Sequence, residues 1–235
     1  MTCPVVAARP NGLIIAIDGP SGAGKSTITR LLADKLGYIH IDTGAMFRTV
    51  ALAAERSGMA IDDEKALAGL CHRVAITFAH SAGGSRVLLD GEDVSEAIRT
   101  PGISLLTSAV SAVKCVRDCM LESQREMGKS GGVVLEGRDI GTVVFPDAEV
   151  KFFLTASAEE RGHRRFLELK AKGEDVSLQG TIAEVARRDA QDEQREHAPL
   201  RKAADAIDID SSGLSIEEVL AFMIEKINER LAAGG

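Results

Sequence analysis

What the 235-residue sequence lacks narrows the classes of protein that it can encode. It has no run of about 18 apolar residues, the length that a helix needs to cross a bilayer, and residues 1–12 hold no apolar segment of signal-peptide length. Positive charge is not in excess either, because the net charge is −7. We therefore expect neither a membrane nor a nucleic acid as partner, and we expect clustered basic residues to bind a small anion.

Cysteine is scarce and scattered, with four residues and no paired Cys-x-x-Cys motifs. Cys115 and Cys119 lie one helical turn apart, a spacing that could place two metal ligands on one helix face. No second pair of Cys or His at a suitable spacing completes a zinc site, so ordinary thiols are the better interpretation. The cysteine usage predicts a reduced, cytoplasmic protein, and we expect residues 1–12 to be a disordered lead-in.

The most informative stretch is an apolar run at 13–17 that passes into Gly-Pro-Ser-Gly-Ala-Gly-Lys-Ser-Thr. The apolar run predicts a strand buried on both faces, and Gly-x-x-x-x-Gly-Lys-Ser is the pattern of a P-loop. Glycines let consecutive backbone N–H groups turn inward around a phosphate, and the following helix directs its positive end at the same anion. The sequence therefore predicts a nucleoside triphosphate site made of Gly19, Pro20, Ser21, Gly22, Ala23, Gly24, Lys25, Ser26 and Thr27.

The chemistry of a bound triphosphate assigns roles to polar side chains in and near this loop. Lys25 can reach the outer phosphates, and a hydroxyl from Ser26 or Thr27 can hold a magnesium ion. Glu136 follows a second buried strand, at 133–135, where P-loop enzymes place an acid near the metal. Mg²⁺ is thus an expected cofactor, and the pattern leaves open which of the two hydroxyls binds it.

Strands and helices alternate along most of the chain, which predicts a parallel α/β core with right-handed crossovers. The segments expected in this core are further strands at 38–41, 150–154 and 206–209, and helices at 25–36, from 45, at 158–172, at 181–193 and after a capping box of Ser215 and Glu218. Antiparallel hairpin strands at 74–78 and 86–89, around a turn at 81–84, interrupt the alternation. We expect a single domain over 13–235, with its core at 13–60, 115–158 and 186–235, an insertion at about 60–115 and a mobile lid at about 160–185.

Charged residues gather where the expected parallel strands end, which is where such sheets bind their ligands. Asp42 ends the strand at 38–41, and Arg48 lies one turn into the next helix, so a phosphate contact is favoured over a solvated charge. Arg138 and Asp139 follow the strand at 133–135 together with Glu136. Unpaired charges are costly to bury, and a structural salt bridge between Arg138 and Asp139 is the less favoured alternative.

Two groups of arginines flank a glycine-containing loop at 173–180 of this acidic chain. They are Arg161, Arg164 and Arg165 on the first helix, and Arg187, Arg188 and Arg195, with Asp192, on and after the second. Basic helices are usually solvated faces, but this arrangement favours a mobile flap over phosphates. Several arginines besides one lysine suit phosphoryl transfer between two phosphorylated molecules, because the acceptor also needs basic contacts.

At these residues a specific resemblance emerges. The P-loop, the run Asp-Thr-Gly-Ala-Met-Phe-Arg at 42–48, the run Gly-Arg-Asp-Ile-Gly-Thr-Val-Val-Phe-Pro at 137–146 and the segment 188–195 together resemble bacterial cytidylate kinases over nearly the whole chain from Leu13. The resemblance implies a P-loop NTPase three-layer sandwich with a nucleoside-monophosphate-binding insertion and a lid. It also implies transfer of the γ-phosphate of ATP to CMP or dCMP with Mg²⁺, and we expect a cytoplasmic monomer.

The resemblance also implies roles for individual residues. The acceptor phosphate would be held by Thr43, Arg48, Arg138 and Arg195, beside Asp42; the cytosine would be read by Ser108, Arg117 and Asp139; the sugar would be held by Arg188 and Asp192. We expect Lys25, Arg138, Arg188 and Arg195 to be catalytic, and Arg161 and Arg165 to contact ATP. Two positions depart from the family pattern, which usually has Gly in place of Ser26 and often Asp in place of Glu136.

Two other functions compete with this interpretation. The first is another small-molecule P-loop kinase, for example one that acts on shikimate or on a different nucleotide. A hydroxylic, unphosphorylated acceptor such as shikimate would leave Arg48 and Arg195 without a phosphate to bind. A nucleotide-hydrolysing switch belongs to a different class, and a GTPase switch would carry Asn-Lys-x-Asp, which this sequence lacks. ADP formation that depends on added CMP distinguishes the cytidylate kinase hypothesis from both.

Overall fold

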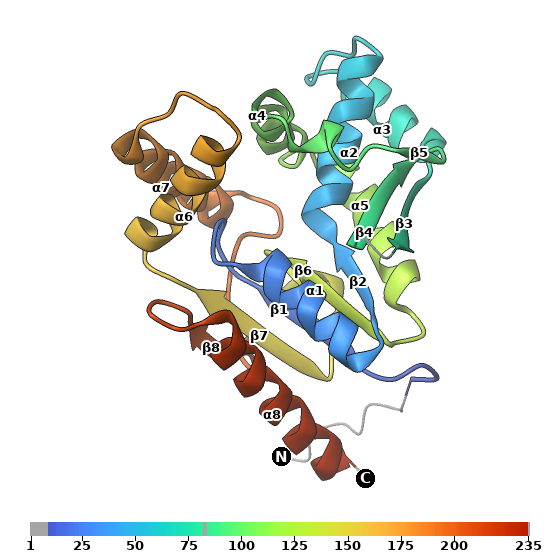
Figure 1. Cartoon of the computed structure of the whole chain (residues 1–235). Coiled ribbons are helices and arrows are strands. Elements are labelled where there is room, and N and C mark those ends of the chain that lie inside the picture. Colours follow the sequence, from blue (N-terminus) through green and yellow to red (C-terminus); the bar gives the residue numbers. More distant parts are fainter. Residues whose placement is uncertain (1–8, 82–83, 235) are drawn as a thin grey trace. The chain divides into compact units, whose positions relative to one another are not determined.

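The computed structural model describes residues 9–81 and 84–234, which form two compact units (Figure 1). Unit 1 comprises the chain up to His40 and from Ser130 onward, and unit 2 comprises Ile41–Lys129. Unit 2 extends beyond the insertion expected at 60–115, because the helices on both sides of that insertion pack with it. Within the described ranges, no helix has both the length and the apolar character that a membrane span requires.

A five-stranded sheet organises unit 1. Its strands, in spatial order, are β2 (Ile39–Asp42), β6 (Val133–Gly137), β1 (Ile14–Asp18), β7 (Val150–Thr155) and β8 (Ile207–Asp210). Strand β1 is parallel to both β6 and β7, and β7 is parallel to β8. Every residue of β1 and β6 is buried, as expected for apolar strands in the middle of a parallel sheet. The expected parallel α/β architecture is confirmed.

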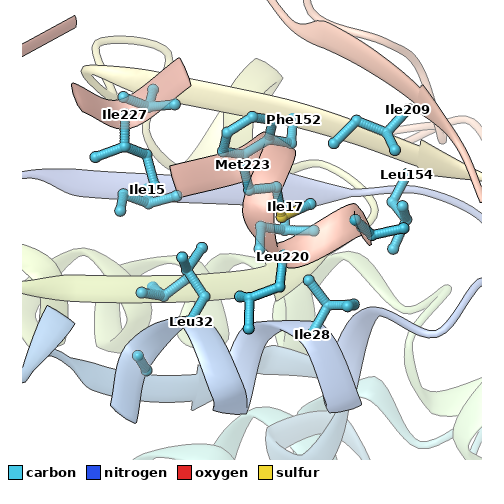
Figure 2. Close-up of a cluster of buried hydrophobic side chains, with 14 of the residues drawn as sticks. Ile15, Ile17, Ile28, Leu32, Phe152, Leu154, Ile209, Leu220, Met223 and Ile227 are labelled. Atoms are coloured by element: carbon cyan, nitrogen blue, oxygen red, sulfur yellow. The ribbon is translucent and has the colours of Figure 1, made fainter. Parts of the chain in front are cut away.

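Helices α1 (Lys25–Leu36) and α8 (Ile216–Gly234) bury their apolar sides in one core cluster with the sheet. Figure 2 shows Leu32 of α1 and Met223 of α8 in this cluster with Phe152 of β7. Helix α1 ends at Gly37, whose left-handed conformation lets its N–H bond to the last turn. The capping box at the start of α8 is confirmed by reciprocal hydrogen bonds between Ser215 and Glu218.

Helices α6 (Ala158–Ala171) and α7 (Leu178–Gln194) form an antiparallel pair in the segment where a lid was expected. Helix α7 begins three residues earlier than the expected Thr181, because Ser177 caps it and accepts a hydrogen bond from Gly180 N at 3.1 Å. A short π-helix, η2 (Ile140–Val144), follows β6, and no sequence pattern predicted it.

Unit 2 contains four helices and a small antiparallel sheet among its described residues. They are α2 (Thr43–Arg56), α3 (Glu64–Arg73), α4 (Pro101–Val110), α5 (Lys114–Gly128) and the single turn η1 (Ala97–Arg99), with strands β3 (Ile76–Ser81), β4 (Gly84–Leu89) and β5 (Glu92–Asp93). The expected turn at 81–84 includes residues 82–83, which lie outside the described residues. Strand β3 starts two residues later than expected and reaches Ser81, because it pairs with the whole of β4. Cys71, Cys115 and Cys119 are free thiols, and burial raises the pKa of Cys71 to about 12.

The expected disordered lead-in covers residues 1–12, of which 1–8 lie outside the described residues. Residues 9–12 are instead held by specific contacts. Arg9 forms ion pairs with Glu149 and Asp147, and Asn11 N donates to Ser130 O at 3.0 Å. Glu149 also accepts from Ile14 N at 2.8 Å, which joins Arg9 to the first residue of β1.

Candidate active site

The P-loop lies between β1 and α1, as the sequence predicted. Gly19, Gly22 and Gly24 have φ angles of 148°, 78° and 89°, a region that side chains disfavour. At Gly19 a Cβ atom would lie 2.0 Å from the carbonyl oxygen of Leu154, so only glycine fits there. These conformations turn backbone N–H groups toward one another at the N-terminus of α1, which is the geometry of an anion cradle.

Lys25 is buried within this loop, with only 6% of its surface exposed. Its Nζ donates to the carbonyl oxygens of Gly19 at 2.8 Å and Pro20 at 2.7 Å. Burial and the neighbouring Arg138 guanidinium lower the pKa of Lys25 to about 7, against the opposing effect of Glu136. A buried ammonium group at a helix N-terminus is poised to bind phosphate oxygens.

A network of arginines and carboxylates follows β6 and the end of α7. Arg138 Nε donates to Asp192 Oδ2 at 2.8 Å, and Arg195 Nη1 lies 3.5 Å from the other oxygen of Asp192. Arg195 Nη2 lies 3.6 Å from Asp139 Oδ1, while its Nε donates to Ala198 O at 2.6 Å. The expected site residues of β6 and α7 are therefore joined, and Arg138 pairs with Asp192 of α7 rather than with its neighbour Asp139.

Like charges converge at this network. Burial and Arg138 both lower the pKa of Arg188, and Arg138 also lowers that of Lys25. Arg138 thus disfavours the charged forms of both Lys25 and Arg188, and a bound anion would add a counter-charge to that of Asp192. This convergence of Lys25, Arg138 and Arg188 indicates a site for a polyanionic ligand, and it agrees with the phosphate site expected from the sequence.

The residues expected to hold a metal also lie together. Ser26 Oγ donates to Glu136 Oε2 at 2.7 Å, and Glu136 Oε1 lies 2.9 Å from His40 Nε2. A carboxylate and hydroxyls, with Thr27 exposed on the next position of α1, are hard oxygen donors that suit Mg²⁺. Over residues 9–81 and 84–234, no three His, Cys, Asp or Glu side chains form a metal-binding group. Mg²⁺ therefore fits here only with phosphate oxygens and water completing its coordination.

Sequence reasoning missed Asp18, the last residue of β1. Its carboxylate is buried and accepts from the N–H groups of Ile140 at 2.8 Å and Gly141 at 2.7 Å. These two donors begin the π-helix directly after Asp139, so Asp18 fixes the backbone that carries Arg138 and Asp139. Burial raises the pKa of Asp18 to about 6, although both backbone donors oppose the rise.

Asp18→Asn is expected to change the pH dependence of stability in a defined direction. The folded protein binds the Asp18 proton more tightly than the unfolded chain, whose pKa is 3.8. The stabilising contribution is therefore complete below pH 4 and is lost as the pH rises through 6, with a total of about 3 kcal/mol. Urea unfolding gives the free energy of unfolding of the wild-type protein and of Asp18→Asn at pH 4.5 and 7.5. Subtracting the pH-dependent change of the variant from that of the wild-type protein removes the contribution of every other group. Equal pH dependence in both proteins would contradict a raised pKa.

Two arginines of α6, Arg161 and Arg165, have different environments. Arg161 is only 5% exposed, and it forms an ion pair with Asp189 at 2.6 Å. Its Nη1 donates to Ser21 O at 2.9 Å, and its Nε donates to Ala156 O at 2.9 Å. Arg161, expected to contact ATP, is instead engaged with the P-loop backbone and with α7. Arg165 remains 31% exposed and contributes to lowering the pKa of Arg188, which places it beside the cationic network.

In unit 2, Asp42, Thr43 and Arg48 lie at the start of α2. Asp42 Oδ1 caps the helix by accepting from Ala45 N at 2.8 Å, and its Oδ2 accepts from Arg48 Nη2 at 2.8 Å. Thr43 is buried, and Arg48 keeps 28% of its side chain exposed. Asp42, expected to contact substrate, thus has a structural role in the described conformation: it caps α2 and orients Arg48.

The expected cytosine readers of unit 2 lie on α4 and α5. Arg117 stacks over the ring of Phe47 at 5.3 Å and donates from Nη1 to Ser111 O at 3.1 Å. Its guanidinium plane is thereby fixed between α2 and the end of α4, while Ser108 is exposed on α4. The third expected reader, Asp139, belongs to unit 1.

Comparison with known proteins identifies the family. Residues 15–229 match the family model described as cytidylate kinase. The chain is 70% identical to the cytidylate kinase of Geobacter sulfurreducens over 95% of its own length and 96% of that protein, and 66% identical to that of Geobacter sp. strain M21 over 96% and 97%. Among solved structures, an uncharacterized protein from Eubacterium ventriosum shares the fold, with a TM-score of 0.51, 12% identity, and coverage of 92% of this chain and 98% of that one.

Proposed function

The chain belongs to the cytidylate kinase family, and on that premise we propose that it transfers the γ-phosphate of ATP to CMP or dCMP. The products are ADP and CDP or dCDP. The structural observation that carries the proposal is the convergence of Lys25, Arg138 and Arg188 beside the P-loop. One cation and a backbone cradle suffice for a single bound polyphosphate, and the additional guanidiniums match a second phosphate, that of the acceptor.

The donor half of the proposed reaction uses the P-loop. Its backbone N–H groups and the α1 N-terminus bind the β- and γ-phosphates, and Lys25 donates to their oxygens. Ser26 or Thr27, with Glu136, would hold Mg²⁺, which supplies charge neutralisation between the phosphates when bound. Arg161 supports the loop through Ser21 O, whereas the partly exposed Arg165 would contact ATP directly.

The acceptor half places guanidiniums around the phosphate of CMP. Arg138 and Arg195, which share Asp192 as a partner, would hold it, and the family resemblance implies the same role for Arg48 and Thr43. Arg188 and Asp192 would contact the sugar. A lid at about 160–185, formed by α6 and α7, would close over the reacting phosphates and exclude water, which favours transfer to the acceptor over hydrolysis.

Base selection would depend on Asp139, Ser108 and Arg117. A carboxylate accepts a hydrogen bond from the exocyclic amine of cytosine and repels the carbonyl that uracil has there. The Arg195 guanidinium lies 3.6 Å from this carboxylate. The family resemblance implies that Arg117 also contacts the cytosine. We further propose that the enzyme acts as a monomer in the cytoplasm.

A coupled assay of ADP release with a panel of acceptors tests the proposed function. CMP and dCMP are expected to exceed UMP in kcat/KM by up to about 10⁴, because the site would lose a hydrogen bond and gain a repulsion with uracil. AMP, GMP and shikimate serve as the remaining acceptors. The proposal is overturned if CMP reacts no faster than UMP or AMP. ADP formation that is indifferent to CMP would instead favour a nucleotide-hydrolysing switch.

A further inference from the structure

Glu136 is held by two donors from different elements of unit 1. Ser26 Oγ of α1 donates to Glu136 Oε2 at 2.7 Å, and His40 Nε2 of β2 lies 2.9 Å from Glu136 Oε1. Both members of the His40–Glu136 pair are shielded from solvent, with side chains 11% and 5% exposed. Strand β2 is the sheet neighbour of β6, so the imidazole comes from the strand next to the one that ends in Glu136 and Gly137.

The contact determines which ring nitrogen of His40 carries the hydrogen. A carboxylate only accepts hydrogen bonds, so Nε2 must be the donor. Nδ1 is buried and has no hydrogen-bond partner among the described residues. The Nε2–H group is therefore the part of His40 that can orient the Glu136 carboxylate.

Restraint of the carboxylate matters more for a glutamate such as Glu136 than for an aspartate. Glutamate has one more rotatable bond, so its carboxylate must be restrained more strongly to present the same geometry. Mg²⁺ requires nearly ideal octahedral coordination and is therefore sensitive to the orientation of a carboxylate near it. Hydrogen bonds to both oxygens of Glu136 restrain the whole group.

We propose that His40 is a positioning residue for the metal-binding carboxylate, acting through Glu136 and not on the nucleotide. The inference deepens the proposed function, since it assumes that ATP is bound together with Mg²⁺. It predicts that loss of the His40 donor weakens the coupling between metal and nucleotide, whereas nucleotide binding without metal, which depends on the P-loop backbone and Lys25, stays the same.

The test compares His40→Gln with His40→Met. The two side chains have similar length, but only glutamine places an N–H donor where His40 Nε2 lies. Calorimetry gives the dissociation constant of β,γ-methylene-ATP in Mg²⁺ and in EDTA, and their ratio measures how much the metal tightens binding. We expect His40→Met to reduce this ratio about tenfold and His40→Gln to retain it within about threefold, with the EDTA value unchanged in both.

The inference is overturned if His40→Met keeps the wild-type ratio, if both variants lose it equally, or if Mg²⁺ does not tighten binding to the wild-type protein. Unchanged binding in EDTA shows that the P-loop is folded. If His40→Met does not bind the nucleotide in EDTA, His40→Asn takes its place in the test. The asparagine amide is one bond too short to reach the Glu136 carboxylate, so the same reduction of the ratio is expected. The acceptor panel is a separate measurement, so a failure of CMP specificity is distinguishable from a failure of this inference.

Discussion

Lys25→Met is expected to lower kcat/KM for phosphoryl transfer by about 10³ while leaving the protein folded. Methionine has nearly the length of lysine but cannot donate to the transferring phosphate. The Lys25→Met variant should be more stable than the wild-type protein although it is less active. Because the pKa of Lys25 is about 7 in the folded protein and 10.5 when unfolded, burying the charged form costs stability at neutral pH, and methionine avoids that cost. The coupled assay and calorimetric unfolding at pH 7 measure the two effects.

Lys35→Met is the matched control for this experiment. Lys35 lies on the same helix, in its last turn, and is exposed. Its replacement should change neither activity nor melting temperature appreciably. A loss of activity below tenfold in Lys25→Met, or a loss that merely follows unfolding, would mean that Lys25 does not act on the phosphates.

Arg138→Met should lower kcat/KM for CMP by about 10³ and raise the KM for ATP by less than about threefold. The expected asymmetry arises because Arg138 lies after β6 and pairs with Asp192, whereas the proposed ATP site consists of the P-loop backbone and Lys25. A secondary effect is a rise in the pKa of Lys25, since Arg138 is among the groups that lower it. Initial rates over a grid of CMP and ATP concentrations separate the effects on the two substrates.

Arg187→Met provides the comparison, because Arg187 is an exposed arginine on α7 next to Arg188. Its kinetics should stay near those of the wild-type protein. If Arg138→Met weakens ATP and CMP equally, Arg138 does not belong to the acceptor half of the site, and the proposed division between the two substrates fails.

The P-loop and the parallel core were predictable because both depend on local sequence. An apolar strand, a glycine spacing and a helix at 25–36 follow one another directly in the chain, so their geometry needs no distant partner. Helix boundaries that depend on caps were predicted less accurately. Ser177 caps α7, so the helix begins three residues before the expected Thr181. A capping serine in a polar loop looks like any other serine until its hydrogen bond is known.

The arginines of α6 show where sequence reasoning reaches its limit. Arg161 and Arg165 are one helical turn apart and look equivalent in the sequence, yet one is buried against the P-loop and the other is partly exposed. Their difference arises from the close approach of α7, where a Cβ atom on Gly162 would lie 2.8 Å from Ile182 Cα. That contact depends on tertiary packing, and only the conspicuous glycine within α6 could have hinted at it.

Asp18 and His40 were missed for a related reason. Asp18 finds its partners at Ile140 and Gly141, and His40 finds Glu136 on a neighbouring strand. Nothing in the sequence near either residue indicates these distant partners. The available signal was weak: each polar residue stands at or near the end of an apolar strand that precedes expected ligand-binding residues.

The pairing of β1 with β6 has a consequence for the chain during synthesis. Ile14 is in register with Val133, 119 positions later (133 − 14), so the most apolar strand of the protein emerges from the ribosome long before its neighbour exists. At translation rates of about 5–20 residues per second, this interval lasts about 6–24 s. During this interval the apolar side chains of the unpaired β1 segment are exposed and can promote aggregation. A bound chaperone would protect the segment until β6 has been synthesised.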